Sequence, residues 1–140
     1  MSEPVVSEGD RIVFHPMFGQ RLVTLDGEAT MIASGTARVA QRKIAVLGDE
    51  KRQRWPARYT LCGYIGGEGI VEIVQLTGGQ IAPCTTAGAP IILQGQRFFA
   101  RFTPTVPALL AAPPNTPDTM MPSMGQGYFI AQQTSVTASR

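Results

Sequence analysis

The side chains that could do chemistry in this chain are few, because it contains one histidine and two cysteines. Imidazole and thiolate groups are the ligands that zinc prefers, so His15, Cys62 and Cys84 could supply three of the four ligands of a zinc site. Their spacing contains no close ligand pair, and the fourth ligand would have to come from an acid or from a symmetry mate. We therefore predict no metal and no cofactor, with this zinc site as a minor alternative.

Nucleophilic catalysis would need His15 as its base, since a serine or cysteine nucleophile depends on one. His15 lies in the apolar run FHPMFG, before a proline, and we interpret it as a half-buried turn residue. The glycine-rich stretch GYIGGEG (63–69) is not followed by a lysine and serine or threonine pair, so it does not predict a phosphate loop. The sequence therefore predicts a protein that is not an enzyme.

The strongest polar feature is a basic segment between residues 38 and 58, which holds seven of the twelve lysines and arginines. Cations beside a flat aromatic side chain suit single-stranded nucleic acid or an acidic protein surface. A solvated loop with Asp49 and Glu50 as local counter-charges is the interpretation that we favour, so nucleic acid is not an expected partner. The candidate partner surface consists of Arg38, Arg42, Lys43, Lys51, Arg52, Arg54, Trp55 and Arg58.

The composition predicts one β-rich domain. A chain of 140 residues with 44% hydrophobic and 16% charged residues can bury a core, and 15 glycines with 11 prolines favour turns over long helices. The net charge of +2 indicates no particular partner. The two cysteines are expected to be reduced, although a disulfide between them stays open.

The sequence also shows no recognisable targeting signal. The longest apolar runs are far shorter than the roughly 20 residues of a membrane helix, so we expect no membrane partner. The start MSEPVVSEGDR does not have the pattern of a secretory signal. We therefore expect a protein that is cytoplasmic on synthesis, with export by a signal-independent machine left open.

Alternation of apolar and polar residues predicts the secondary structure. We expect an all-β fold, a small barrel or sandwich of about eight short strands built from hairpins, with minimal helix. A helical turn is expected within 49–58, and a glycine-rich loop at 62–69. The expected strands cover 11–15, 20–25, 29–33, 37–40, 44–47, 69–76, 90–93, 97–102 and 125–136.

The composition changes sharply after residue 103. The stretch TPTVPALLAAPPNTPDTMMPSM holds six of the eleven prolines and one charge, which is typical of an extended connector. We therefore predict a β-domain over 1–103, a Pro-rich connector over 104–124, and a C-terminal strand and tail over 125–140 that docks on the same domain, at an edge of the sheet.

One phrase occurs twice, as SGTARVAQRKIAVLGDE (34–50) and AGAPIILQGQRFFARF (87–102). We interpret it as a hairpin used twice. Together with the opening GDRIVFHPMFG, these stretches resemble PAAR-like proteins, small β-rich tips on the spike of bacterial contractile injection machines such as type VI secretion. The family's zinc site uses several histidines and a cysteine, so this chain, with one histidine, inherits no zinc ligands from the resemblance.

The resemblance implies a non-enzymatic structural and interaction domain. It predicts a protein partner, either the spike itself or an effector component. The alternative function is a binding module for nucleic acid or an acidic partner through the basic segment 38–58. The sequence leaves the oligomeric state open.

Overall fold

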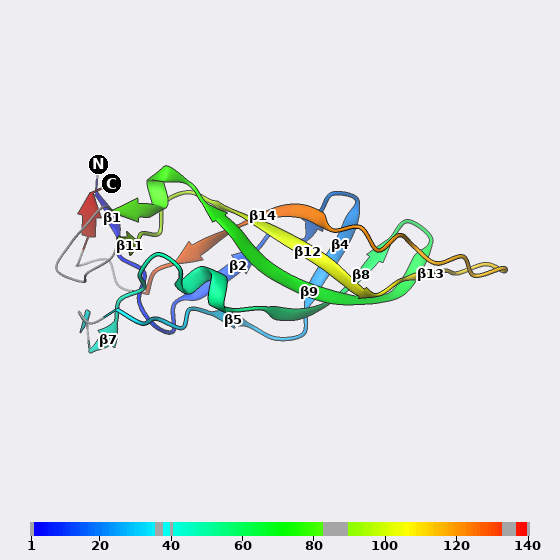
Figure 1. Cartoon of the computed structure of the whole chain (residues 1–140), viewed down its shortest axis with the longest axis horizontal. Helices are drawn as coiled ribbons and strands as arrows, with labels where there is room; N and C mark the ends of the chain where they lie inside the picture. Colours follow the sequence, from blue (N-terminus) through cyan, green and yellow to red (C-terminus); the bar gives the residue numbers. More distant parts are fainter. Residues whose placement is uncertain (1, 36–37, 40, 83–89, 133–136, 140) are drawn as a thin grey trace.

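The computed structural model of the 140-residue chain describes residues 2–35, 38–39, 41–82, 90–132 and 137–139. Its main feature is one antiparallel sheet that curls into a half-barrel (Figure 1). In sheet order, its strands are β3 (Met17–Phe18), β4 (Arg21–Leu25), β8 (Trp55–Leu61), β9 (Tyr64–Leu76), β12 (Phe98–Val106), β14 (Ser123–Ile130), β2 (Arg11–Phe14) and β5 (Ala29–Thr30), with β13 (Leu109–Leu110) paired to β9. The predicted all-β class is confirmed.

Short elements complete the structure around this sheet. Three small pairs form, all antiparallel: β1 (Ser2–Pro4) with β15 (Thr137–Ser139), β6 (Arg38–Val39) with β7 (Arg42–Lys43), and β10 (Ile81–Ala82) with β11 (Ile91–Ile92). Two single 3-10 turns are η1 (Asp49–Arg52), inside the predicted helical turn, and η2 (Gly78–Gln80). No helix in the described part of the chain is long and apolar enough to cross a membrane.

The hollow of the half-barrel is filled by aromatic side chains. Phe98, Ala100 and Phe102 alternate along β12 and are fully buried, while Phe99 and Arg101 are partly exposed on the other face. This division follows the period-two pattern that the sequence predicted. Phe129 lies 4.9 Å from Phe98 between ring centroids, and Tyr59 lies 5.0 Å from Phe102. Edge-to-face and tilted contacts of this kind add to the free energy gained from burial.

The predicted glycine-rich loop at 62–69 is wrong, because most of it belongs to β9. The turn between β8 and β9 is confined to the residues around Gly63, and strand begins again at Tyr64. Gly67 and Gly69 lie inside the strand, where aromatic rings cover them. A Cβ atom at Gly67 would lie 2.2 Å from Cε1 of Tyr59, and one at Gly69 would lie 2.4 Å from Cζ of Phe102. These glycines are therefore strand residues that make room for the core.

A β-bulge interrupts the alternation of faces along β9. Phe99 pairs with Gln75 and Ala100 pairs with Ile73, so Val74 is an extra residue on this strand. The bulge returns Leu76 to the buried face that carries Ile73, whereas strict alternation placed Leu76 on the opposite face. Buried and exposed side chains therefore alternate on either side of the bulge, but the alternation is broken at the bulge itself.

The second quoted phrase does not form the predicted hairpin. Residues 91–92 pair with β10, while β12 pairs with β9 and β14. In the first phrase, β6 and β7 do form a small hairpin, but the predicted strand 44–47 contributes only isolated bridges at Ile44 and Val46. The strand β8, which was not among the predicted strands, begins at Trp55, two residues beyond the end of η1, and runs through Pro56.

The chain after β12 leaves the sheet and then returns to it. Residues 107–122 contain only the two-residue strand β13, and the loop that follows β13 reaches one end of the molecule (Figure 1). β14 then lies between β12 and β2, inside the sheet and not at its predicted edge. Both chain ends lie at the opposite end, near β1 and β11 (Figure 1).

We predict that Gly69→Ala lowers the free energy of unfolding by about 2 kcal/mol, because the added methyl group meets the Phe102 ring and the Thr103 carbonyl oxygen, 2.5 Å away. Urea denaturation measures the change. Gly27→Ala is the matched control, since nothing lies within 4 Å of a Cβ atom there. Equal stability of the two variants would contradict this account of the strand glycines.

Candidate functional site

Three chain segments form a closed ring of backbone hydrogen bonds at the end that holds the termini. The amide of Val6 donates to the carbonyl of Ile92 (3.0 Å), the amide of Ile92 to that of Ala45 (3.0 Å), and the amide of Ala45 to that of Val6 (2.9 Å). All three residues are fully buried. We call Val6, Ala45 and Ile92 the threefold ring, because each segment makes the same bond to the next.

The residues around the ring repeat the same threefold relation. A second set of bonds joins Glu8 N to Lys43 O (2.8 Å), Leu47 N to Pro90 O (2.7 Å) and Gln94 N to Pro4 O (2.9 Å). Each donor lies two positions after a ring residue, and each acceptor lies two positions before another. The bridges follow the same rule, joining the residue before one ring position to the residue after another: Val5 with Leu93, Ile44 with Ser7, and Ile91 with Val46. The three segments are thus equivalent in their backbone pairing.

The ring separates two apolar clusters. The ring residues Val6, Ala45 and Ile92 belong to the large aromatic core of the half-barrel. Their immediate neighbours point to the other side, because side chains alternate along an extended segment. There the neighbours Val5, Ile44, Ile91 and Leu93 form a second cluster with Ala82, and Val46 packs against it. The ring is therefore the layer that joins the half-barrel to the terminal end of the molecule.

Each ring segment is followed by a glycine with positive φ: Gly9 (φ 87°), Gly48 (φ 107°) and Gly95 (φ 54°). In the first two segments an aspartate completes the turn. Asp10 accepts a hydrogen bond from the amide of Ser7 (2.8 Å), and Asp49 accepts one from the amide of Val46 (3.0 Å). Both carboxylates are buried, as their turn-forming role requires. The Gly-Asp pairs 9–10 and 48–49 therefore form the turns that follow the first two ring segments.

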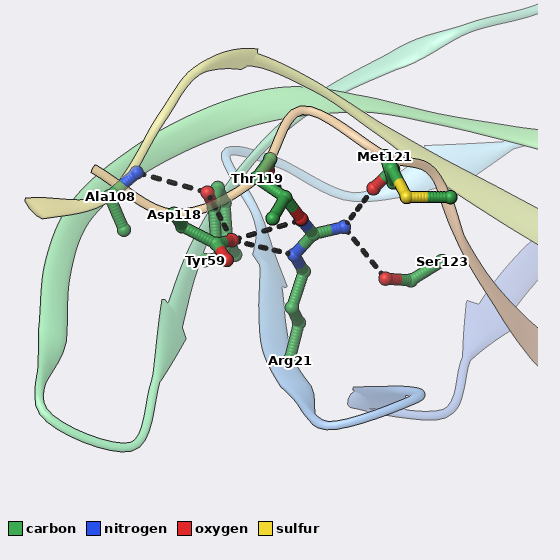
Figure 2. Close-up of polar contacts among 7 residues, drawn as sticks. All are labelled: Arg21, Tyr59, Ala108, Asp118, Thr119, Met121 and Ser123. Carbon is green, nitrogen blue, oxygen red and sulfur yellow. Dashed lines mark hydrogen bonds and ion pairs between the residues drawn. The ribbon is translucent and has the colours of Figure 1, made fainter. Parts of the chain in front are cut away.

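At the opposite end, one buried arginine binds residues 107–122, the segment between β12 and β14, to the sheet (Figure 2). Arg21 on β4 donates to the Asp118 carboxylate (2.9 and 3.1 Å), to the Thr119 and Met121 carbonyls (2.8 and 2.5 Å) and to the Ser123 hydroxyl (2.7 Å). The side chains of Arg21 and Asp118 are only 5% and 8% exposed. Removing two charges from water is costly, and the hydrogen bonds around this buried pair offset that cost.

Tyr59 connects this arginine to the aromatic core. Its hydroxyl donates to the Asp118 carboxylate (2.9 Å) and accepts from the amide of Ala108 (2.9 Å). The Arg21 guanidinium lies 5.0 Å from the centre of the Tyr59 ring, a cation–π distance. Burial raises the pKa of Tyr59. Burial also works to raise the pKa of Asp118, but the hydrogen bonds from Arg21 and Tyr59 outweigh it and lower that pKa below its usual value.

Neither Arg21 nor Asp118 is among the site residues predicted from the sequence. Each residue nevertheless carries a signal. Arg21 is the only charge in the apolar strand QRLVTL, and Asp118 is the only charge between residues 103 and 129. Isolated charges in apolar surroundings often mark a buried pair, but only the fold brings these two together across 97 positions.

The predicted basic segment is divided between two places. Arg38, Arg42 and Lys43 lie on the small β6–β7 hairpin, whereas Arg54, Trp55 and Arg58 lie beside or within β8. At least four of the cations have acidic partners: Arg42 with Asp10 (3.8 Å), Arg52 with Asp49 (4.0 Å), Arg54 with Glu72 (3.4 Å) and Arg58 with Asp26 (3.3 Å).

Trp55, the aromatic member of that set, packs against Phe14 with 5.3 Å between ring centroids. It belongs to the margin of the core and is half-buried. Lys51 is exposed on η1. The arrangement gives no support to the nucleic-acid alternative, and the basic segment as a partner surface stays a prediction.

The three residues of the alternative zinc site are not brought together by any described contact. His15 lies in the bend after β2, is exposed rather than half-buried, and stacks edge-to-face on Tyr128 at 5.8 Å. Cys62 is exposed in the β8–β9 turn, and Cys84 lies outside the described residues. Within the described ranges, no group of three or more histidine, cysteine, aspartate or glutamate side chains could hold a metal ion.

Comparison of the chain with known protein families gives one match. A family model described as "Contractile injection system spike tip protein" matches residues 1–139, nearly the entire chain. No curated protein matches the chain.

We predict that Asp118→Ala lowers the free energy of unfolding by about 3 kcal/mol, because it leaves the Arg21 guanidinium buried without a counter-charge. The double variant Arg21→Met/Asp118→Leu should lose less than the sum of the two single changes. Asp26→Ala, which breaks the exposed pair with Arg58, should cost less than about 1 kcal/mol. Chemical denaturation measures the wild type, these three variants and the single variants Arg21→Met and Asp118→Leu. Equal losses for Asp118→Ala and Asp26→Ala would contradict this account of the buried pair.

We also predict that the contribution of the Arg21–Asp118 pair to the free energy of unfolding depends on pH. Because the pKa of Asp118 is lowered in the folded protein, its contribution to stability is complete above the ordinary carboxyl pKa of about 3.9 and is lost as the pH falls through the folded value. Unfolding free energies of the wild type and Asp118→Asn should therefore differ most near neutral pH and converge on acidification. A difference that stays constant from about pH 7 to about pH 2 would exclude this linkage.

Proposed function

The chain belongs to the contractile injection system spike tip family, and we propose that it caps the spike of such a machine as a non-enzymatic, PAAR-like tip. Family membership makes it a structural component with protein partners. We further propose that the machine is bacterial and of the type VI kind, and that the chain is made in the cytoplasm and leaves the cell with the spike.

The observation that carries this proposal is the threefold ring. Val6, Ala45 and Ile92 give one chain three equivalent segments at the end where its termini lie. A single asymmetric chain can match a threefold partner when its docking end repeats three times, because each segment then faces an equivalent surface. We propose that the ring end, which consists of the ring, the second apolar cluster and the adjoining β6–β7 hairpin, rests on the spike.

The rest of the fold suits this orientation. The half-barrel extends away from the ring, and the loop after β13 forms the far end of the molecule (Figure 1). With the ring end on the spike, this loop points outward. A protein seated this way needs no reactive group, only a packed body, which the two apolar clusters on opposite sides of the ring provide.

Stoichiometry tests this function. Purified chain mixed with the spike protein of the same machine should form a complex of one tip chain per three spike chains, measured by size-exclusion chromatography with light scattering. One tip chain on each spike chain, or no complex at all, would contradict the proposal.

Two pairs of substitutions test the orientation. Lys43→Glu/Leu47→Asp changes exposed side chains beside the ring without touching its backbone bonds, and it should weaken the complex roughly tenfold or more. Ile65→Thr/Leu109→Thr changes exposed side chains at the far end and should leave the affinity unchanged. Loss of binding in the second pair alone would show that the chain is seated the other way.

A further inference from the structure

Three short strand pairs surround the threefold ring in equivalent places. Each pair contains the stretch of chain that reaches one ring residue: β1–β15 precedes Val6, β6–β7 precedes Ala45, and β10–β11 includes Ile92. All three pairs are antiparallel, and they lie together at the end of the molecule opposite to β13 (Figure 1). We call β1–β15, β6–β7 and β10–β11 the ring pairs.

The register of β1–β15 matches that of the β6–β7 hairpin position by position. Pro4 and Lys43 each lie two positions before a ring residue, and the carbonyl of each accepts a hydrogen bond from the next segment (2.9 and 2.8 Å). Counted from these two residues, the strands pair with the same offsets. The matching pairs are Pro4–Thr137 with Lys43–Arg38, and Glu3–Ala138 with Arg42–Val39.

The two chain ends therefore stand where the other pair has its turn. Residues 40–41 connect β6 to β7. At the corresponding place, Ser139 pairs with Ser2, and these residues come from opposite ends of the sequence. The N-terminal and C-terminal strands thus form the same unit as β6–β7, except that no turn joins them.

The ring pairs share their backbone arrangement but not their side chains. Glu3 and Arg42 are in equivalent positions and have opposite charges, while Ile91 and Ile92 in the third pair are buried and apolar. A threefold partner offers the same surface three times, so it can bind all three pairs alike only through what they have in common. Strand backbone is such a feature, because its amides and carbonyls can pair with a strand of another chain whatever the side chains are.

We propose that β1 and β15 together form one of three docking elements, and that each ring pair contacts one chain of the spike through its strand backbone. This inference rests on the proposed function and specifies the surface that performs it. β15 pairs with no strand but β1 among the described residues, so its place in the fold is at the docking end alone. The two terminal strands are then needed for binding more than for the stability of the half-barrel.

Proline substitutions at equivalent positions test this role. Ala138→Pro and Val39→Pro each remove a backbone amide from a ring pair and disfavour strand pairing. Each should weaken binding of the full chain to the purified spike protein roughly tenfold or more, measured by biolayer interferometry, because one of three contacts is lost. Ala138→Val keeps the amide and should bind as the wild type does. Equal affinity of Ala138→Pro and the wild type would overturn the proposal.

Hydrogen exchange on the wild-type chain tests the contact without any substitution. When the spike protein is added, amide exchange should slow at least tenfold in β1, β15 and β6–β7, and it should stay unchanged in the β8–β9 turn at the other end. Slower exchange in β6–β7 with none in β1 and β15 would show that the terminal strands do not dock. The urea midpoint of Ala138→Pro should equal that of the wild type, which separates lost binding from lost folding.

The wild-type complex separates this assignment from the function on which it rests. If the wild type forms no complex with one tip chain per three spike chains, the proposed function fails, and the docking role of β1 and β15 fails with it. If the wild type forms that complex and Ala138→Pro forms it equally well, only the role of β1 and β15 is overturned.

Discussion

The rest of the structure depends on one closed set of backbone hydrogen bonds, in which Val6, Ala45 and Ile92 each donate to the next. A β-sheet edge normally leaves donors and acceptors free, but a ring of three segments satisfies each one with its neighbour. The ring can close only when segments about forty residues apart along the chain meet. Once closed, it fixes one face against the aromatic core and the other against the terminal cluster. It is also the reason that one chain can present threefold symmetry.

The sequence predicted what local patterns determine. Alternation in RFFARF predicts a strand at 97–102, and the structure has β12 there with Phe98, Ala100 and Phe102 buried on one face. We recognised two related phrases where the structure has three equivalent segments. VVSEGD shares its apolar start and its glycine with both other segments, but it shares its aspartate only with IAVLGD. The three segments are equivalent in their backbone hydrogen bonds, and these depend only weakly on which residues form them.

Features set by tertiary contacts could not be predicted. The glycines in GYIGGEG indicated a loop, but Gly67 and Gly69 are glycines because the Tyr59 and Phe102 rings lie over them. The bulge at Val74 has no local signature and inverts the face of Leu76. The pair of Arg21 and Asp118 joins residues that look unrelated along the chain. Phe102 lies 33 positions from Gly69, and Asp118 lies 97 positions from Arg21, so a local pattern cannot contain these neighbours.

The two ends of the molecule thus differ in physical character. The end with the termini holds the threefold ring and its apolar cluster, and the opposite end holds an uncharged loop that Arg21 binds to the sheet. The most direct test of their assignment is a cryo-electron microscopy map of the assembled spike with this chain bound. The account predicts that Val6, Ala45 and Ile92 surround the threefold axis of the spike, with residues 111–117 farthest from it along that axis. A map in which the ring lies away from the axis, or in which the 111–117 loop faces the spike, would contradict it.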